Sequence, residues 1–201
     1  MKTASPLRKK KRQRTYLELV KTALQLFREQ GYEQTTVEQI AETADYSAST
    51  FFRYFGSKEE VAFYGVQSLF QEFGEEIMSL PAAASPWEHI SQSMVEACRK
   101  LTTLTEELGH NQIELWIKEP TLDRRFRGLS TEWETQISKA YALHTKTHPE
   151  TDITANLISK AVIAAAHNGF QLHIATGKEL SIIVADSLKL LEKGFGEEGS
   201  T

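Results

Sequence analysis

The sequence contains very little cysteine: Cys98 is the single one among 201 residues. An intrachain disulfide is therefore impossible, which is typical of proteins from a reducing compartment. Uninterrupted apolar runs are also short, because the longest, residues 161–166, is far below the ~20 residues that span a bilayer. The basic N-terminus lacks the apolar segment of a signal peptide. These absences predict a cytoplasmic protein with no membrane partner.

Signatures of catalysis and of metal binding are missing as well. The chain has no Gly-rich phosphate loop and no GxSxG, HExxH or CxxC motif. His144 and His148 have the spacing of metal ligands on a helix, but no third ligand lies nearby and Pro149 follows at once. We therefore expect no catalytic residue, no metal and no cofactor.

Strand patterns are absent too, whereas helical periodicity is nearly continuous. Thr36 with Gln39, and Ser57 with Glu60, have the spacing of capping boxes. Gly31 is suited to the position just past a helix end. The sequence predicts an all-α fold with a first helix ending at Gly31, followed by helices over 37–44, 48–55, 57–78, 86–105, 110–118, 122–145, 152–176 and 179–195.

Charge is distributed unevenly along the chain. Residues 1–58 carry eleven Lys/Arg and six Asp/Glu, a net of +5, and residues 59–201 carry twelve and twenty-one, a net of −9. The extreme is LRKKKRQR, residues 7–14, with six positive charges and no acid. A basic first quarter on an acidic body is typical of a nucleic-acid-binding protein. The alternative for the basic run alone is a solvated tail, and we predict that residues 1–11 are disordered.

Three phenylalanines, an arginine and a tyrosine crowd residues 51–55. At 100° per residue, a helix over 48–55 has one apolar side and one side that carries hydroxyls and a guanidinium. The apolar side contains Ala48, Phe51, Phe52 and Phe55, and the polar side contains Ser49, Thr50, Arg53 and Tyr54. We expect the apolar side to pack on the two preceding helices and the polar side to enter a DNA major groove.

The segment TTVEQIAETADYSASTFFRYFGSKEE, residues 35–60, resembles the helix-turn-helix of the TetR family of bacterial regulators. The resemblance implies a three-helix DNA-binding domain over residues 12–60, a helical effector-binding and dimerisation domain over 61–195, and a frayed tail over 196–201. The sequence departs from the family at Asp45-Tyr46, where Gly-Val is common, and at Phe52, where many members have a tyrosine that reaches a phosphate. If residue 45 has a positive φ, aspartate tolerates it better than most residues.

The resemblance also implies which residues contact DNA. Arg53 is the expected direct reader, since a guanidinium pairs with guanine O6 and N7, although a phosphate contact is the alternative. Thr36, Tyr54 and Lys58 are expected to hold phosphates, which position the protein without reading sequence; capping is the alternative role of Thr36. The full implied set is Thr36, Ser47, Ala48, Ser49, Thr50, Phe52, Arg53, Tyr54 and Lys58.

For the rest of the chain, the family implies a homodimer formed by the last two long helices, with apolar residues Ile183, Val184, Leu188 and Leu191 on the final one. The middle helices would enclose an apolar ligand, although each of their apolar stripes is also what a simple core looks like. The expected ligand-contacting residues are Met94, Cys98, Trp116, Phe126, Trp133 and His167, the last with a hydrogen-bonded core histidine as its alternative.

The sequence therefore predicts a homodimeric transcriptional regulator, a repressor released from a palindromic DNA operator by a small apolar effector. FFRYF and the segment around IKEPTLDRRF resemble family members with acyl-CoA-like ligands. Two alternatives stay open. One is an architectural DNA-binding protein without an effector, and the other is an acyl-group carrier or enzyme, which would leave residues 36–58 unexplained.

Overall fold

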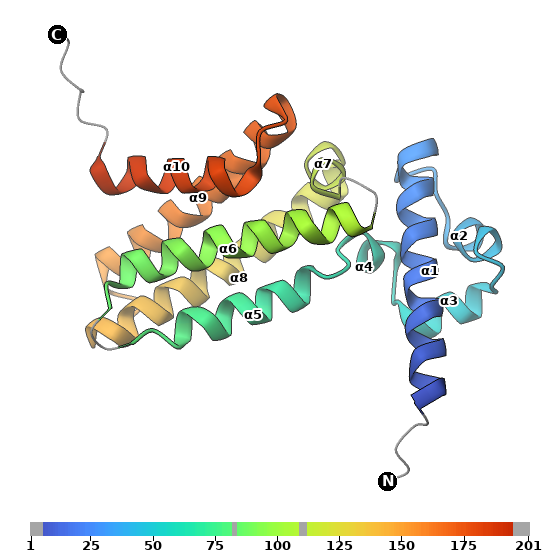
Figure 1. Cartoon of the computed structure of the whole chain (residues 1–201), viewed down its shortest axis with the longest axis horizontal. Coiled ribbons are helices and arrows are strands. Elements are labelled where there is room, and N and C mark those ends of the chain that lie inside the picture. The colour runs from blue at the N-terminus through green and yellow to red at the C-terminus, as the bar shows by residue number, and fades with distance from the viewer. Residues whose placement is uncertain (1–5, 82–83, 109–111, 195–201) are drawn as a thin grey trace. The chain divides into compact units, whose positions relative to one another are not determined.

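A computed structural model describes residues 6–81, 84–108 and 112–194 (Figure 1). These residues form ten α-helices and no strand, which confirms the predicted all-α class. Among them, no helix combines the length and the apolar character needed to cross a lipid bilayer. The helices are α1 (Pro6–Gln30), α2 (Val37–Thr43), α3 (Ala48–Tyr54), α4 (Lys58–Ala62), α5 (Val66–Met78), α6 (Pro86–Glu107), α7 (Gln112–Lys118), α8 (Pro120–Thr145), α9 (Ile153–Thr176) and α10 (Leu180–Lys193).

The chain divides into two compact units. Unit 1 contains the described residues up to Tyr64 together with those of 105–122, and unit 2 contains 65–104 and the described residues from Asp123 onward. Helices α1 to α4 and α7 thus belong to unit 1, whereas α5, most of α6, α8, α9 and α10 belong to unit 2. The predicted division at residue 60 assigns α7 to the second domain, but the structure groups it with the first four helices.

Unit 1 is built around α1, which packs against α2 and α4, while α2 packs against α3. The buried side of α1 repeats at helical spacing, with Leu19, Val20, Ala23, Leu24 and Phe27 all nearly inaccessible to solvent. Helix α7 joins this core through Trp116, whose ring stacks on Phe63 at 5.2 Å between centroids.

Helix α1 begins earlier than the sequence predicted. It starts at Pro6, whose missing N–H and fixed φ suit the first position of a helix. The predicted disordered tail over 1–11 is therefore wrong for residues 6–11, which are helical. Residues 1–5, and the predicted frayed tail over 196–201, lie outside the described residues.

The predicted long helix over 57–78 is wrong, because it is broken into α4 and α5. Gly65 has a φ of +80° at the break, a conformation that side chains disfavour. A Cβ atom at this position would also approach Leu104 Cδ2 to 2.2 Å. The apolar residues continue at helical spacing across the break, so their periodicity alone did not reveal it.

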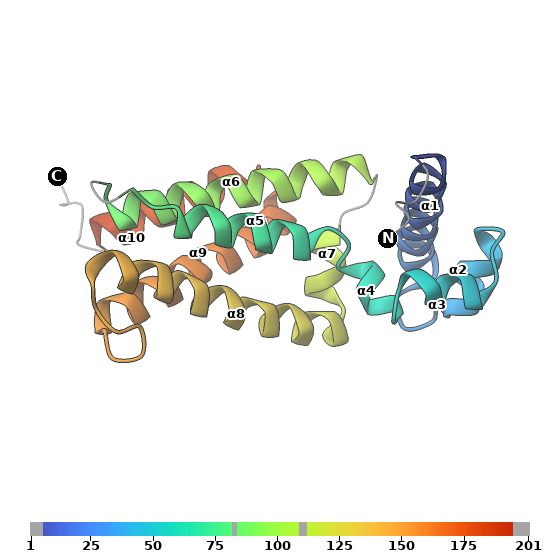
Figure 2. The ribbon, with the colours of Figure 1, turned by 90° about the horizontal axis from the view of Figure 1, so that it is seen from below.

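In unit 2, α5, α6 and α8 run along one another (Figures 1 and 2). Trp133 of α8 stacks on Phe70 and on Phe73 of α5, at 5.5 and 5.2 Å between ring centroids. An ion pair of 2.8 Å joins Lys100 of α6 to Glu72 of α5. Aromatic packing thus joins α8 to α5, and a partly exposed ion pair lies between α6 and α5.

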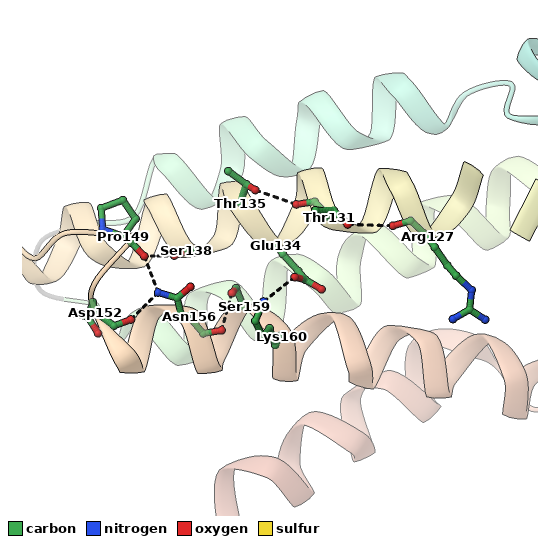
Figure 3. A network of polar contacts seen from close by, with 10 residues as sticks. All are labelled: Arg127, Thr131, Glu134, Thr135, Ser138, Pro149, Asp152, Asn156, Ser159 and Lys160. Carbon is green, nitrogen blue, oxygen red and sulfur yellow. Dashed lines mark hydrogen bonds and ion pairs between the residues drawn. The ribbon is translucent and has the colours of Figure 1, made fainter. Parts of the chain in front are cut away.

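Helices α8 and α9 are joined by a polar network (Figure 3). The carbonyl oxygen of Pro149 accepts hydrogen bonds from Ser138 Oγ at 3.2 Å and from Asn156 Nδ2 at 2.7 Å. Farther along, Lys160 of α9 pairs with Glu134 of α8 at 3.1 Å. These contacts set the register of α9 on α8.

Helices α9 and α10 make the closest packing of unit 2. A Cβ at Gly169 would lie 2.4 Å from Val184 Cγ2, so this glycine permits the approach of α10. Ile183, Val184 and Leu188 are buried within the chain, and Leu191 is half-buried. The apolar stripe predicted for a dimer contact is therefore wrong in that role, because three of its four members pack inside the protomer.

Candidate nucleic-acid interface

The first helix of the predicted helix-turn-helix begins at a complete capping box. Thr36 Oγ1 accepts from the backbone N–H of Gln39 at 3.1 Å, and the Gln39 side chain accepts from the Thr36 N–H at 2.9 Å. Asp45 in the following turn has a φ of 59°, the left-handed conformation anticipated for a residue standing where glycine is common. The local sequence therefore accounts for both ends of α2.

Helix α3 presents its two faces to different environments. Phe51 and Phe55 are 0% and 3% exposed and belong to the core of unit 1. Phe52, which was expected on the apolar side, is instead 55% exposed. It lies about 100° around the helix from Phe51, and the stripe that packs on the core is too narrow to include it. The structure thus adds Phe52 to the exposed face.

Small hydroxyl residues occupy the N-terminal end of that exposed face. Ser47 caps α3 by accepting from the N–H of Thr50, and its Oγ lies 2.9 Å from Ser49 Oγ and 3.1 Å from Thr50 Oγ1. Ala48 beside them is half-buried and Ser49 is exposed. Hydroxyl groups that rotate between donor and acceptor roles suit either base edges or phosphates.

Two guanidinium groups flank Tyr54 at the other end of α3. Arg53 Cζ lies 5.5 Å from the centroid of the Tyr54 ring, and Arg12 Cζ of α1 lies 6.0 Å from it. Tyr54 also makes an edge contact with Tyr16 at 6.1 Å. Because α1 begins at Pro6 and includes Arg12, this cation of the basic run lies beside the exposed face of α3. The sequence pattern indicated its charge but not this position.

Lys58 is placed differently from the prediction. Its Nζ donates to the carbonyl oxygens of Tyr32 at 2.7 Å, Thr35 at 3.0 Å and Glu33 at 3.4 Å, and it lies 4.2 Å from the centroid of the Tyr32 ring. An ammonium group has three donors, and these carbonyls take them all. The geometry corrects the predicted phosphate contact: Lys58 fixes the loop before α2.

Tyr46 ties the turn between α2 and α3 to α1. Its hydroxyl donates to Glu18 Oε2 at 2.6 Å, and Arg14 Nε donates to the other carboxylate oxygen at 2.8 Å. The hydrogen bond from Tyr46, reinforced by Arg14, lowers the pKa of the Glu18 carboxyl below its usual value. Sequence reasoning noted Tyr46 only as a departure from the family and missed this network.

The six residues expected to contact a ligand are divided between the two units. Trp116 belongs to unit 1, where its Nε1 donates to the carbonyl oxygen of Ala62 at 2.7 Å, whereas the other five belong to unit 2. Met94 and Cys98 are buried in α6, and burial raises the pKa of the Cys98 thiol to about 12. This thiol is therefore protonated and unreactive at neutral pH.

The remaining three belong to packed contacts of unit 2. His167 Nε2 lies 2.9 Å from Ser130 Oγ, and its ring is 5.5 Å from that of Phe126. Burial, with a smaller effect from Arg127, lowers the pKa of His167, which favours a neutral imidazole. All three side chains are half-buried, and Trp133 stacks on Phe70 and Phe73 instead of on Phe126 or His167. His167 is hydrogen-bonded to Ser130, which agrees with the alternative stated for that residue.

A cavity of about 730 Å³ lies elsewhere in unit 2, along α5, α6 and α10. None of the six predicted residues lines it. Its apolar wall comprises Leu69, Phe73, Trp87, Val95 and Leu188. Ser91 also lines it, and the Oγ of Ser91 is buried without a hydrogen-bond partner. Within the described ranges, no group of three or more His, Cys, Asp or Glu is arranged to hold a metal ion.

Comparison with known families matches two segments of the chain. Residues 19–64 match the family described as bacterial regulatory proteins, tetR family. Residues 84–196, more than half of the chain, match the MftR C-terminal domain, a C-terminal domain type of the same family.

Among curated proteins, the HTH-type transcriptional regulator TcmR of Streptomyces glaucescens is 45% identical over 85 residues, which are 42% of this chain and 38% of TcmR. The chain thus matches less than two fifths of the length of that relative. Thermus thermophilus FadR, solved with lauroyl-CoA, has a TM-score of 0.57 and 20% identity, over 92% of this chain and 97% of that one. Stenotrophomonas maltophilia SmeT, solved with triclosan, has a TM-score of 0.67 and 15% identity, over 92% and 93%. At these identities, the structural likeness concerns the fold.

Proposed function

Because the chain belongs to the TetR family of bacterial regulatory proteins, we propose that it is a homodimeric transcriptional regulator, a repressor that a small molecule releases from its operator. The observation that carries the proposal is the exposed face of α3. There, Ser49, Phe52 and Arg53 are exposed on a helix whose other face is anchored by Phe51.

The proposed DNA contacts are of two kinds, contacts to bases and contacts to phosphates. Arg53 has the donors to read a guanine, and Phe52 offers apolar contact to a thymine methyl. Thr36, Ser47, Ala48, Ser49, Thr50 and Tyr54 complete the proposed interface, with Thr36 and Tyr54 on phosphates. The basic residues of α1 around Arg12 add phosphate contacts that carry no sequence information.

Dimerisation is supported by apolar side chains that the protomer leaves exposed on α9 and α10. Ile153 and Leu157 of α9 are 83% and 65% exposed, and Ile182 and Leu190 of α10 are 54% and 56% exposed. A second copy of the chain covers this surface in the proposed four-helix contact. The two-fold symmetry of the dimer then matches a palindromic operator.

The proposed effector site is the cavity along α5, α6 and α10. Its volume lies in the range of about 300–1,000 Å³ that is common for small-molecule sites. Its apolar wall favours an apolar ligand. The solved relatives with bound lauroyl-CoA and triclosan both hold molecules with a large apolar part.

The charged side chains that line this cavity indicate which charge the effector carries. Five carboxylates line it (Glu72, Glu76, Glu88, Glu96 and Glu192) against three cations (Arg99, Lys100 and Lys189). Lys100 and Arg99 are already paired with Glu72 and Glu96. A polyanionic coenzyme A group would therefore meet net negative charge, so we favour an uncharged or cationic apolar molecule over an acyl-CoA-like one.

In the proposed mechanism, the effector releases the operator by changing the distance between the two recognition helices of the dimer. The chain passes from α4 to α5 through Gly65, and α5 lines the proposed effector cavity. A dimer that reads successive major grooves needs its recognition helices about 34–36 Å apart. An effector that binds better when this spacing is lost must weaken DNA binding, and DNA must weaken effector binding by the same factor. We propose no enzymatic reaction for the chain. We also propose that the protein acts in the cytoplasm, where it meets its operator.

The test begins with selection of bound sequences from random DNA duplexes, followed by a screen for compounds that release the selected operator. Matched long-chain probes would then be compared: an acyl-CoA, the corresponding alcohol and the corresponding amine. Ligand titrations with and without operator should differ by one common factor in both directions. Equal ligand affinity with and without operator would show that ligand binding and DNA binding are not coupled. That result would favour an architectural DNA-binding protein.

A further inference from the structure

Phe52 is the large apolar side chain that the exposed face of α3 carries. The residue is 55% exposed, whereas Phe51 and Phe55 are 0% and 3% exposed. The ring of Phe52 meets that of Phe51 edge-on, at 5.7 Å between centroids and an interplanar angle of 86°. The buried neighbour thus supports the ring of Phe52 on one side, while more than half of the residue's surface stays accessible.

The neighbours of Phe52 along the helix surface leave room for a base to approach its ring. Residues three and four positions apart are neighbours on a helix. At these positions before Phe52 lie Ser49 and Ala48, both small, and three positions after it Phe55 is buried in the core. The ring therefore projects beyond the side chains next to it, on the helix that is proposed to enter the major groove.

Arg53 follows directly on the same face and is also exposed. Its Cζ lies 5.5 Å from the centroid of the Tyr54 ring, and α3 itself contains no carboxylate that could pair with the guanidinium. A guanidinium donates two parallel hydrogen bonds to O6 and N7 of guanine. Adjacent exposed positions of α3 thus offer an apolar surface and a pair of donors side by side.

Two neighbouring groups on the major-groove edge of DNA match this pair of side chains. Guanine presents N7 and O6 as acceptors, and thymine presents its C5-methyl group. Where a thymine stands directly 5′ of a guanine, its methyl group lies beside that guanine on the same strand. 5-Methylcytosine carries the same methyl group on the same carbon, whereas unmodified cytosine has only a hydrogen there.

We propose that Phe52 and Arg53 together read a C5-methylated pyrimidine followed by guanine, with Phe52 on the methyl group and Arg53 on the guanine. Thymine and 5-methylcytosine are both accepted at the first position, and cytosine is disfavoured. Binding to an operator with CpG at this step then depends on whether its cytosine is methylated. The proposal rests on the proposed function, because it concerns the same face of α3, and it extends that function to the modification state of the operator.

Removal of single methyl groups from the selected operator tests this reading. Each thymine would be replaced in turn by deoxyuridine, which keeps the base pair and lacks only the C5-methyl group. One lost methyl contact should weaken wild-type binding by about four-fold, and loss in both half-sites by about fifteen-fold. The sensitive thymine should directly precede a guanine.

A second pair of duplexes tests the modified base. The sensitive thymine–adenine pair would be replaced by cytosine–guanine in both half-sites, once with cytosine and once with 5-methylcytosine. The methylated duplex should bind wild type about fifteen-fold more tightly than the unmethylated one, because it restores both methyl contacts.

Two variants assign the effect to Phe52. Phe52→Ala removes the ring, so it should bind the thymine and deoxyuridine operators equally, and likewise the methylated and unmethylated duplexes. Phe52→Leu keeps an apolar side chain and should retain most of the preference for the methyl group. The measured quantity is a ratio of two affinities of one protein, which a merely structural role of Phe52 would leave unchanged. Thermal melts verify that both variants fold.

The proposal is overturned if wild type binds the deoxyuridine operators and the unmethylated duplex as tightly as their methyl-bearing counterparts. It is equally overturned if Phe52→Ala keeps the preference for the methyl group, or if the selected operator contains no thymine–guanine step in its half-sites. In all three cases wild type still prefers its operator to a random duplex, so the proposed regulatory function stands. Loss of that preference itself would overturn both.

Discussion

The hydroxyl of Tyr46 lies 2.6 Å from a carboxylate oxygen of Glu18, and this bond connects the turn between α2 and α3 to the middle of α1. Tyr46 follows Asp45, which holds the turn in a left-handed conformation. The orientation of α3 on the core therefore depends on a polar contact as well as on Phe51. Where many family members have a small Gly-Val turn, this chain has a hydrogen-bonded one.

Tyr46→Phe should lower the free energy of unfolding by about 1 kcal/mol at neutral pH, because it removes one hydrogen bond to a charged group at a partly exposed site. The lowered pKa of Glu18 means that its contribution is present above the ordinary glutamate pKa and is lost as the pH falls through the lower folded-state value. Urea unfolding should thus show the difference between wild type and variant shrinking in acid, where the contact of the Tyr46 hydroxyl with Thr15 Oγ1 is the part that remains. A difference that is the same at neutral and acidic pH would contradict this.

Phe51→Ala and Phe52→Ala form a matched pair on adjacent positions of α3. Phe51 is fully buried, so its truncation should cost about 3–5 kcal/mol of stability. Phe52 is exposed, so its truncation should leave the melting temperature nearly unchanged while weakening operator binding. Thermal melts and binding titrations on both variants decide the assignment. A stable Phe51→Ala protein and an unfolded Phe52→Ala protein would reverse it.

Replacing Lys10, Lys11 and Arg12 by glutamine should flatten the salt dependence of DNA binding. Each phosphate contact contributes a slope of about −0.9 in log K against log salt, so the loss of three contacts from each protomer of the proposed dimer changes the slope by roughly 5.4. Glutamine keeps a good helix former at these positions of α1. Lys160→Gln in unit 2 is the control and should leave the slope unchanged. An unaltered slope in the triple variant would show that the basic run is only solvated.

Leu157→Glu should convert the dimer to monomers without unfolding the protomer. Leu157 is 65% exposed on α9, and Leu143 is 64% exposed on α8, so Leu143→Glu is a control of equal exposure outside the proposed contact. Analytical ultracentrifugation of both variants measures the oligomeric state. A monomeric Leu143→Glu protein together with a dimeric Leu157→Glu protein would move the interface to α8.

Helix positions could be predicted because their signals are local. The capping box at Thr36 and Gln39 and the glycine at 177 mark helix ends whatever the tertiary structure, and both ends agree with the structure to within a residue or two. The break at Gly65 was missed because the apolar spacing runs through it, and its cause is partly Leu104, a residue far away in sequence.

Contacts between distant residues account for the errors at the sites. Lys58 was assigned to phosphate from its place in the motif, but its ammonium finds three carbonyls in the loop after α1. Tryptophan is a residue type that often lines ligand sites, yet the ring of Trp116 stacks on Phe63 within unit 1. A stripe of apolar residues looks the same whether it lines a cavity or fills one, so only the assembled structure separates the two.

The measurement that tests the central claim most directly is the ratio of affinities for the selected operator and for a random duplex of equal length at one salt concentration. A regulator that reads bases through α3 should favour its operator by at least about 10³-fold. Arg53→Ala should reduce this ratio, with affinity for the random duplex nearly unchanged. A wild-type ratio near one would contradict the account, because the basic surface would then bind DNA without reading it.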